Sequence, residues 1–505
     1  MASTGNVDKI LATFQDMKRR YSHTIHPNFM SYFHITRCLQ KVKEDEERLA
    51  YLWRVYALMG SRDRQVKVGG HLLEALIKTY GALGHFDEAT EVFDSISGLS
   101  NSACLRAILF ACSAADPPEW EIAQSLLHAS DIVDGGVGPG LVEPGALCNT
   151  MLACSKAGEW EESLQLMRLY GEQSELSIVA VNSLIAACGR AGRPDMSMEV
   201  LYEVEGRGMK LDTRSYRSTI IACNQAEHEY RRSVQLEQSH QQKKSSNKRT
   251  KNGFEWWECA ISLLRRMKES GLQPDTPTLS STISACEAAG QWQRALYLLQ
   301  SAMNDDATVA LNVYCFNAAI SACEKGGAWV EALEIYEKMK QQGGTELRPN
   351  LVTVSSLILA LDNAGQKEFA VNVYREGLRK QCIRSPWRMT KNSTINTEPI
   401  MAMDLHSYSA AMTRAAIRNH MNTLISRPGK SMMTNVDTTT TPPLDWIIIV
   451  GQGFHSIDGR PILKDTVLNL LRLEYGIDAV LDDRNFGRIL IPANSIQQFI
   501  SKRRW

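Results

Sequence analysis

The sequence lacks three features that would narrow its function at once. It has no net charge, because 56 lysines and arginines balance 56 aspartates and glutamates, so overall charge does not indicate a nucleic-acid partner. It has no run of about 18 apolar residues, which excludes an ordinary membrane-spanning helix. Its 12 cysteines include no Cys-x-x-Cys pair, which argues against structural zinc and against a zinc deaminase. Any contact with nucleic acid must therefore come from local groups of side chains.

What the sequence has instead is a cysteine and a tryptophan that recur in one register. Three pairs are each six residues apart: Cys154/Trp160, Cys286/Trp292 and Cys323/Trp329. The surrounding segments are of the type Ala-Cys-x-x-x-Gly-x-Trp-x-x-Ala-Leu, and they return with a period of about 35 residues, which indicates a stacked repeat architecture. Because the cysteines occupy an apolar helix position, we expect buried free thiols and a reducing compartment.

The segment 313–350 is the clearest copy of the repeat. Phe316, Ile320 and Cys323 fall on one helical face, and Gly326-Gly327 then ends the first helix. A second apolar stripe begins at Trp329. Each unit is therefore predicted to be a helical hairpin, which must stack on its neighbours to bury both stripes, with the tryptophans buried between hairpins.

The ends and beginnings of the units distinguish between two helical-hairpin families of this period. Units close with Leu-Asp212, Pro-Asp275 and Pro-Asn350, and helices open with Val-Asn182-Ser-Leu-Ile or Phe-Asn317-Ala-Ala-Ile. This pattern resembles the pentatricopeptide-repeat family, whose units read Val-x-Tyr-Asn-x-Leu-Ile and end in Lys-Pro-Asp/Asn. The resemblance covers residues 1–385. It implies a mainly α, right-handed α-α superhelical solenoid that binds single-stranded RNA without a cofactor. Tetratricopeptide arrays of similar period bind peptides, so a protein-binding scaffold stays open as an alternative.

In this register the units run over 29–67, 68–101, 102–144, 145–177, 178–212, 213–275, 276–312, 313–350 and 351–385. Residues 10–28 resemble only the second helix of a unit. We therefore expect the chain to begin within a repeat and to have lost its genuine N-terminus. The lack of a targeting peptide then says nothing, and the family resemblance implies a role in RNA processing, stabilisation or translation in a chloroplast or mitochondrion.

The resemblance also assigns base reading to the fifth and the last residue of each unit, with about one base per unit. The pairs are Asn182 with Asp212 (uridine type), Arg217 with Asp275 (no familiar type), Ser280 with Asn312 (adenine type) and Asn317 with Asn350 (pyrimidine type). These pairs predict the preference 5′-U-N-A-Y-3′ across residues 178–350, with RNA parallel to the chain. Ser355, and either Cys148 or Asn149, are further candidate readers. The alternative is that each Asn is a helix cap.

The unit 213–275 carries an insert between Cys223 and Trp257. We expect residues 226–254 to form a disordered loop, and its segment 238–252 is basic with no acidic residue. The insert is either a tolerated loop or a source of nonspecific attraction to phosphates. The helical pattern stops again at 386–398, which is predicted to be a linker.

From residue 399 to 505 the pattern alternates between strand and helix. Strands are predicted at 400–405, 446–450 and 488–491, and helices at 407–425, at 461–475 and at the C-terminus. This order predicts a small α/β sandwich domain.

Two signatures in this domain resemble those of the Small MutS-Related family. Met403-Asp404-Leu405-His406 matches the family's Leu-Asp-Leu-His, and Val450-Gly451-Gln-Gly453-Phe-His455-Ser456 matches its Thr-Gly-x-Gly-x-His-Ser. Met403 and Val450 depart from the pattern, and Val450 lacks the hydroxyl of threonine.

The resemblance implies nucleic-acid binding by the domain and, in some members, endonuclease activity. Gly451, Gly453, His455 and Ser456 would then form a phosphate or RNA loop. His406 would act as general acid or base, and Asp404 would orient a proton carrier or hold a divalent ion such as Mg²⁺. Alternatively, Asp404 and His406 only brace the turn. The predicted partner is single-stranded RNA, without a membrane; the sequence does not indicate protein partners.

Overall fold

The computed structural model describes most of the chain from residue 70 onward. The described ranges are 70–94, 102–133, 143–171, 176–241, 255–304, 311–342, 347–391, 399–426, 446–451, 462–482, 485 and 487–502, together with residues 12, 50 and 52. The segment 10–28 and the unit 29–67 therefore lie outside the described residues almost entirely. No helix in the part of the chain that the structure describes is long and apolar enough to cross a membrane.

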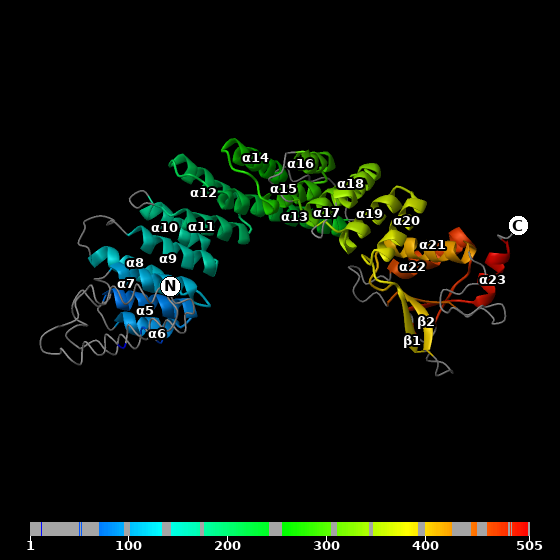
Figure 1. Ribbon diagram of the computed structural model, residues 1–505, viewed down its shortest axis with the longest axis horizontal. Coiled ribbons are helices and arrows are strands. Elements are labelled where there is room, and N and C mark those ends of the chain that lie inside the picture. Colours follow the sequence, from blue (N-terminus) through cyan, green and yellow to red (C-terminus); the bar gives the residue numbers. More distant parts are fainter. Residues whose placement is uncertain are drawn as a thin grey trace. The chain divides into compact units, whose positions relative to one another are not determined.

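The array from residue 70 to 379 consists of consecutive paired helices (Figure 1). Their bounds are α5 Gly70–Leu83, α6 Phe86–Asp94, α7 Ser102–Ala114, α8 Trp120–Val133, α9 Pro144–Ala157, α10 Trp160–Tyr170, α11 Ile178–Arg190, α12 Pro194–Gly206, α13 Thr213–Gln241, α14 Trp256–Glu269, α15 Thr276–Ala288, α16 Trp292–Asn304, α17 Val313–Lys325, α18 Trp329–Gln342, α19 Leu351–Asn363 and α20 Lys367–Arg379. The chain is mainly helical, and these pairs follow the predicted repeat boundaries.

Local signals in the sequence explain where the hairpins begin and turn. Asn312 caps α17, since its side chain accepts hydrogen bonds from the backbone N–H groups of Tyr314 (3.1 Å) and Cys315 (3.2 Å). Gly327, with φ 71°, lies between α17 and α18, a backbone conformation that glycine adopts without strain. First helices pack on first helices of the next unit, as α15 does on α17 and α17 on α19. Within each compact unit, consecutive first helices thus share one core.

The repeated cysteines and tryptophans occupy different depths. Cys154, Cys286 and Cys323 are fully buried, as expected. Trp160, Trp292 and Trp329 are only half-buried, so the expectation of burial between hairpins is wrong in degree. Each tryptophan is the first residue of a second helix, where its ring covers the edge of the next hairpin. These side chains therefore join neighbouring units from the rim of the core.

Three contacts show how the tryptophans join neighbours. The Arg193 guanidinium lies 5.3 Å from the Trp160 ring centroid, and the Trp329 and Phe369 rings are 6.1 Å apart. A side chain added at Gly326 would collide with the Trp292 ring. In each case the partner belongs to the following unit.

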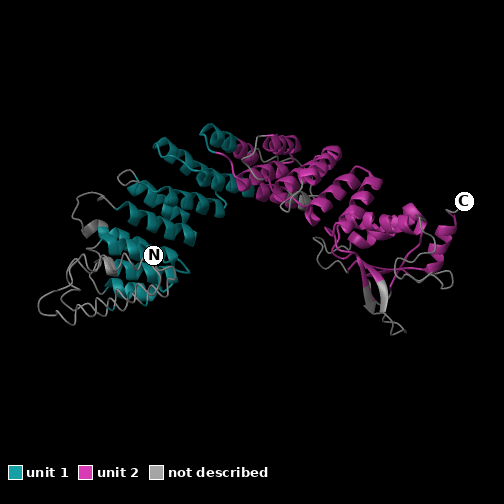
Figure 2. Ribbon diagram, in the orientation of Figure 1, with its two compact units in different colours: residues 1–226, 262–272 teal, residues 227–261, 273–505 magenta. Residues whose placement is uncertain are grey.

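The chain divides into two compact units (Figure 2). The first comprises residues 1–226 and 262–272, and the second comprises residues 227–261 and 273–505. The second unit thus contains both the last helix pairs of the array and the C-terminal domain.

The structure corrects the prediction that residues 226–254 form a disordered loop. Helix α13 does not end where other first helices end but continues to Gln241. Glutamate, arginine and glutamine have good helix propensity, and Arg231 Nε donates to the buried Glu227 Oε1 one turn away at 2.7 Å. The rest of the expected loop, residues 242–254, lies outside the described residues.

The C-terminal region forms a five-stranded sheet with strand order β1-β2-β3-β5-β4. The strands are β1 Trp387–Lys391, β2 Pro399–Asp404, β3 Trp446–Ile449, β4 Val480–Leu481 and β5 Arg488–Ile491. Only the β2–β3 pairing is parallel among these neighbours. Its helices are α21 Ala410–Ser426, α22 Ile462–Leu470, the π-helical turn η2 Leu471–Tyr475 and α23 Ala493–Lys502. The predicted strands at 400–405, 446–450 and 488–491 correspond to β2, β3 and β5, and the predicted helices are present, whereas β1 and β4 were not predicted.

Strand β1 corrects the prediction that residues 386–398 are a linker. It pairs antiparallel with β2, so that Arg388 lies opposite Ala402. The Trp387 ring packs against His420 of α21 and Trp446 of β3, with centroid distances of 4.8 and 6.2 Å. Burial of this aromatic side chain favours the strand over a solvated linker.

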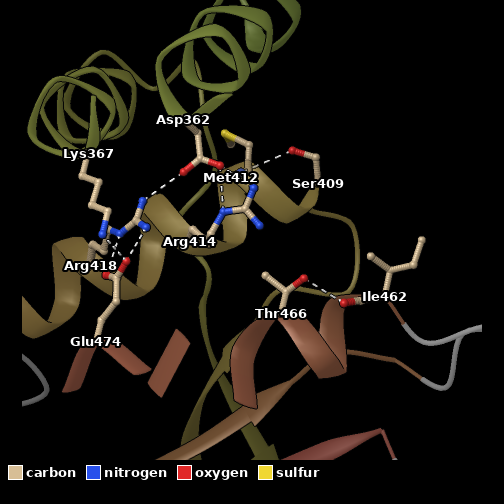
Figure 3. Close-up of polar contacts among 9 residues, drawn as sticks. All are labelled: Asp362, Lys367, Ser409, Met412, Arg414, Arg418, Ile462, Thr466 and Glu474. Carbon is tan, nitrogen blue, oxygen red and sulfur yellow. Dashed lines mark hydrogen bonds and ion pairs between the residues drawn. The ribbon is translucent and has the colours of Figure 1, made fainter. Parts of the chain in front are cut away.

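Helix α21 packs on both helices of the last repeat, α19 and α20. Arg418 of α21 bonds Asp362 at the end of α19 (Nη1 to Oδ1, 3.0 Å) and Glu474 of η2 (Nη2 to Oε1, 2.8 Å). Arg414 also bonds Asp362, and Lys367 of α20 bonds Glu474 at 2.7 Å (Figure 3). The last repeat and the C-terminal domain are thus joined by a chain of ion pairs.

Candidate functional site

The first candidate site lies at the start of the first helices, where the fifth residue of one unit meets the cap of the next. Asn182 Nδ2 donates to both carboxylate oxygens of Asp212, at 3.0 and 3.2 Å. Ser215 Oγ donates to Asn182 Oδ1 at 2.7 Å, and the Ser215 backbone N–H donates to Asp212 Oδ1 at 2.9 Å. The structure therefore brings the predicted pair together and adds a hydroxyl group to it.

Hydrogen bonds control the charge of Asp212. Burial alone would raise its pKa, but the bonds from the Ser215 backbone, the Asn182 amide and the Ser215 hydroxyl outweigh burial and lower the pKa. Asp212 is therefore a carboxylate at neutral pH. Since a carboxylate only accepts hydrogen bonds, it requires the NH₂ side of the Asn182 amide to face it.

An equivalent cluster lies in the second compact unit, around Asn317. Asn317 Nδ2 donates to Asn350 Oδ1 at 3.3 Å, and Thr353 Oγ1 donates to Asn317 Oδ1 at 2.6 Å. The Thr353 backbone N–H donates to Asn350 Oδ1 at 3.0 Å, within a capping box at the start of α19. Asn317 is 8% exposed and Thr353 is fully buried. Both clusters thus combine a helix cap with the fifth-residue amide.

The other predicted pairs are arranged differently. Ser280 Oγ donates to the Pro277 carbonyl at 3.1 Å, whereas Asn312 caps α17, so each bonds its own helix. Asp275 caps α15 through the Thr278 backbone N–H at 3.0 Å. Arg217 is half-buried on α13, and it and Asp275 belong to different compact units. Asn312 and Asp275 are therefore helix caps, and Asp212 and Asn350 bond the start of the next helix while they also contact the amides of Asn182 and Asn317.

The less regular candidates also have local surroundings. Asn149 Nδ2 donates to the Arg106 carbonyl of the preceding unit at 3.0 Å, and Cys148 is half-buried. Ser355 is half-buried on α19. No paired arrangement like that of Asn182 is formed by Asn149.

Exposed apolar side chains lie one turn before the two amides, a feature that the sequence reasoning missed. Val179 is 54% exposed and precedes Asn182, Tyr314 is 69% exposed and precedes Asn317, and Val352 is 55% exposed at the same position of the next unit. Their regular spacing directly after each cap was a signal in the sequence. An exposed apolar group beside a polar amide fits a ligand with flat faces and hydrogen-bonding edges.

The second candidate site lies at the end of β2. His406 Nδ1 and Asp404 Oδ1 are 2.6 Å apart, and Arg388 Nε lies 2.9 Å from Asp404 Oδ2. Asp404 is nearly buried, while His406 and Arg388 are exposed. Arg388 was not predicted, because it comes from the segment expected to be a linker. The Asp404 carboxylate orients the imidazole and leaves the other ring nitrogen, Nε2, toward solvent.

Gly451 places the second signature beside the first. It has φ 75°, and a Cβ added to it would lie 3.5 Å from the His406 Cβ. Gly453, His455 and Ser456 of the predicted phosphate loop lie outside the described residues. The predicted proximity of the two signatures is therefore established at Gly451.

The residues at this site do not fit a Mg²⁺ ion. Both carboxylate oxygens of Asp404 already face positive or hydrogen-bonding groups, Arg388 on one side and His406 on the other. Within the ranges that the structure describes, no group of three or more His, Cys, Asp or Glu side chains could hold a metal ion.

The buried cysteines are chemically unreactive. Burial raises the pKa of Cys154, Cys188, Cys286 and Cys323 to about 12, so these thiols stay protonated at neutral pH. A thiol needs to lose its proton to attack a carbon or bind a metal. The cysteine register is therefore structural, as predicted.

Two segments of the chain, residues 179–209 and 314–344, match the family model of the PPR repeat. Over 150 residues, 28% of this chain, the sequence is 27% identical to pentatricopeptide repeat-containing protein 10, chloroplastic, of Zea mays, and the match covers 19% of that protein. Over 196 residues, 37% of this chain, it is 24% identical to a mitochondrial pentatricopeptide repeat-containing protein of Arabidopsis thaliana, and the match covers 20% of it. The chain thus spans about a fifth of these relatives.

Solved structures of a maize protein of the same kind also align with the chain. The pentatricopeptide repeat protein PPR10 aligns with a TM-score of 0.46 at 18% identity, covering 83% of this chain and 55% of that one. Its complex with an 18-nt psaJ RNA element aligns with a TM-score of 0.34 at 15% identity, covering 83% and 61%. By the matched segments, the chain contains pentatricopeptide repeats at residues 179–209 and 314–344.

Proposed function

We propose that the array binds single-stranded RNA with base selectivity, about one base per repeat, and acts in RNA metabolism in a chloroplast or mitochondrion. The observation that carries the proposal is the recurrence of one polar cluster, Asn182 with Asp212 and Asn317 with Asn350, within the two segments that match the repeat model and at the caps that follow them. The organellar assignment is supported by the chloroplastic and mitochondrial relatives.

The hydrogen-bonding capacity left on each amide suits a base edge. An asparagine side chain has two N–H donors and two acceptor lone pairs. Because the two Asp212 oxygens belong to one carboxylate, a single Asn182 N–H lying between them makes both contacts, and one Asn317 N–H donates to Asn350. One lone pair of each amide oxygen accepts from Ser215 or Thr353. One donor and one acceptor remain, which matches the adjacent acceptor and donor on the Watson–Crick edge of a base.

Apolar contacts supply the sequence-independent part of the proposed binding. Val179, Tyr314 and Val352 are exposed one turn before the fifth residue of their units. Bases of any identity can pack against such side chains, and stacking on the aromatic ring of Tyr314 would contribute about 1–3 kcal/mol. Affinity would thus come largely from stacking and phosphate contacts, and selectivity from the amides.

The first test measures RNA affinity by fluorescence anisotropy for the wild type, a double variant and a control variant. Wild type should bind a short RNA containing 5′-U-N-A-Y-3′ more tightly than one with purines at the first and fourth positions. The double variant Asn182→Ala with Asn317→Ala should lose that difference. Asn372→Ala, an exposed asparagine on α20, is the control and should behave as wild type. Equal affinities for both RNAs in wild type would refute base selectivity, and no binding above background would favour a protein-binding scaffold.

The domain at 399–505 is proposed to be a Small MutS-Related α/β sandwich that contacts RNA near the array. The hydrogen bond between His406 and Asp404 favours a second candidate function, endonucleolytic cleavage. There His406 would transfer a proton at Nε2 while Asp404 holds the ring in orientation. Cleavage of a bound RNA should then be lost in Asp404→Ala and His406→Ala and kept in His85→Ala, an exposed histidine in the array. Cleavage that survives both substitutions would exclude this site.

A further inference from the structure

The hydroxyl groups of Ser215 and Thr353 occupy equivalent places in the two polar clusters. Each is the third residue of the unit that follows a reading amide, and each is fully buried. Ser215 Oγ lies 2.7 Å from Asn182 Oδ1, and Thr353 Oγ1 lies 2.6 Å from Asn317 Oδ1. Because the same arrangement occurs in two separate repeats, the position of the hydroxyl group is a property of the repeat rather than of one site.

The contacts around the hydroxyl leave one orientation for the amide. Backbone N–H groups of α13 and α19 donate to Asp212 and Asn350, which makes the bonded cap oxygens acceptors. The NH₂ side of Asn182 or Asn317 must therefore face the cap. The amide oxygen then faces the hydroxyl. The hydroxyl also lies 3.0 Å from the cap oxygen in each cluster, and we assign its one proton to the nearer amide oxygen. Without this donor, a buried amide oxygen would lose its partner, which costs about 1–3 kcal/mol.

Other units of the chain lack the arrangement where the hydroxyl is missing. Cys315 stands three residues after the cap Asn312, and there Ser280 bonds its own helix. Ala180 stands three residues after Ser177, and there Asn149 bonds the Arg106 carbonyl. In these compared units the amide meets the cap only where the hydroxyl is present. Cap and hydroxyl also occur without an amide, since Thr278 bonds the cap Asp275 and the fifth residue of the preceding unit is Arg217.

We propose that Ser215 and Thr353 are positioning residues for base selection, so that a residue of one unit sets the donor and acceptor order that the preceding unit presents. This inference rests on the proposed function. The hydroxyl groups do not touch RNA. They hold the amide so that its free N–H and its free lone pair keep fixed places.

The test measures base preference at each position separately with the full chain. The probes are short single-stranded RNAs that contain 5′-U-N-A-Y-3′, with the first or the fourth base changed to adenine. Wild type should lose about tenfold in affinity for each change, within the range of one good amide-to-base contact. Ser215→Ala should reduce the loss to about threefold or less at the first base only, and Thr353→Val should do so at the fourth base only.

Each variant is a control for the other, and two further controls address folding. Thr282→Val removes a buried hydroxyl that bonds only the Thr278 carbonyl, and it should keep both preferences. The swaps Ser215→Thr and Thr353→Ser keep the hydroxyl and should restore the preference.

The outcomes separate the inference from the proposed function. If wild type discriminates at both bases and Ser215→Ala and Thr353→Val do so equally well, the positioning role is refuted while base reading stands. A uniform loss of affinity for all RNAs would assign these hydroxyls to helix capping alone and would also overturn the inference. A wild type that discriminates at neither base refutes both.

Discussion

At the scale of single residues, Asn182 and Asn317 each belong to a closed set of hydrogen bonds. Each amide contacts a cap on one side and a hydroxyl on the other, so its orientation is determined by the protein rather than by a ligand. A preorganised amide loses little freedom when a base arrives, which improves both affinity and selectivity. The cap residues therefore stabilise the helix and also orient the neighbouring amide side chain.

The amide positions could be predicted from sequence, but their surroundings could not. Caps and fifth residues follow from a local register that the cysteines define. The hydroxyl contact joins residues that are 33 and 36 positions apart, and this distance depends on how consecutive hairpins stack. Arg388 was missed for a similar reason, because its contact with Asp404 depends on the pairing of β1 with β2.

The depth of the cysteines leads to a prediction about their reactivity. In the folded protein near pH 8, Cys286 and Cys323 should resist alkylation by iodoacetamide, since burial excludes the reagent and raises the thiol pKa to about 12. The half-buried Cys148, Cys259 and Cys382 should be labelled before these two. Mass spectrometry of peptides after timed labelling measures the order, with a sample in urea as control. Equal labelling rates in the native protein would contradict the buried register.

At the scale of elements, α21 connects the last repeat to the C-terminal domain. Repeat arrays need their terminal apolar face covered, and α21 packs on α19 and α20 in that place. Arg418 and Asp362 are each only 7% exposed, so their ion pair is shielded from solvent (Figure 3). Removing one partner of a buried pair leaves a charge without compensation.

Arg418→Ala should therefore destabilise the second unit by about 3–5 kcal/mol, measured as a shift of its urea transition. Arg375→Ala is the matched control, since this arginine lies on α20, is exposed and bonds the uncharged side chains of Asn419 and Asn372. It should change stability by about 0.5 kcal/mol or less. A similar small effect of Arg418→Ala would show that the domain does not depend on this ion pair.

The same network predicts an acid dependence. Hydrogen bonds from Arg418, opposed by burial and supported by Lys367, lower the pKa of Glu474 to about 2. A carboxyl whose pKa is lowered by folding stabilises the protein above its unfolded pKa near 4.5, and this stabilisation is lost as pH falls toward 2. Thermal melts between pH 6 and pH 2.5 should show this loss in wild type, and Arg418→Ala should show much less of it.

Element boundaries were predictable where local chemistry decides them. The helices of the array begin at caps such as Asn312 and Asn350 and turn at glycines such as Gly327, all visible in the sequence. Strand β1 and the extension of α13 were not foreseen. Strand β1 depends on the packing of Trp387 against aromatic residues far away in the sequence. The extension of α13 consists of polar residues with good helix propensity, whose low apolar content led to the prediction of a loop.

At the scale of the whole molecule, the chain combines repeated and non-repeated parts. The repeats supply equivalent polar clusters, so selectivity can be built from similar small contributions, one per unit. The C-terminal region supplies a different kind of site, in which Arg388 of β1 and His406 both contact the Asp404 carboxylate.

The most direct test of base selectivity is selection of RNA by the full chain from a random single-stranded pool, followed by sequencing of the retained molecules. The account predicts enrichment of 5′-U-N-A-Y-3′, with the first position becoming random in Asn182→Ala and the fourth in Asn317→Ala. Retention without any enriched motif, or a motif that is unchanged in both variants, would contradict it.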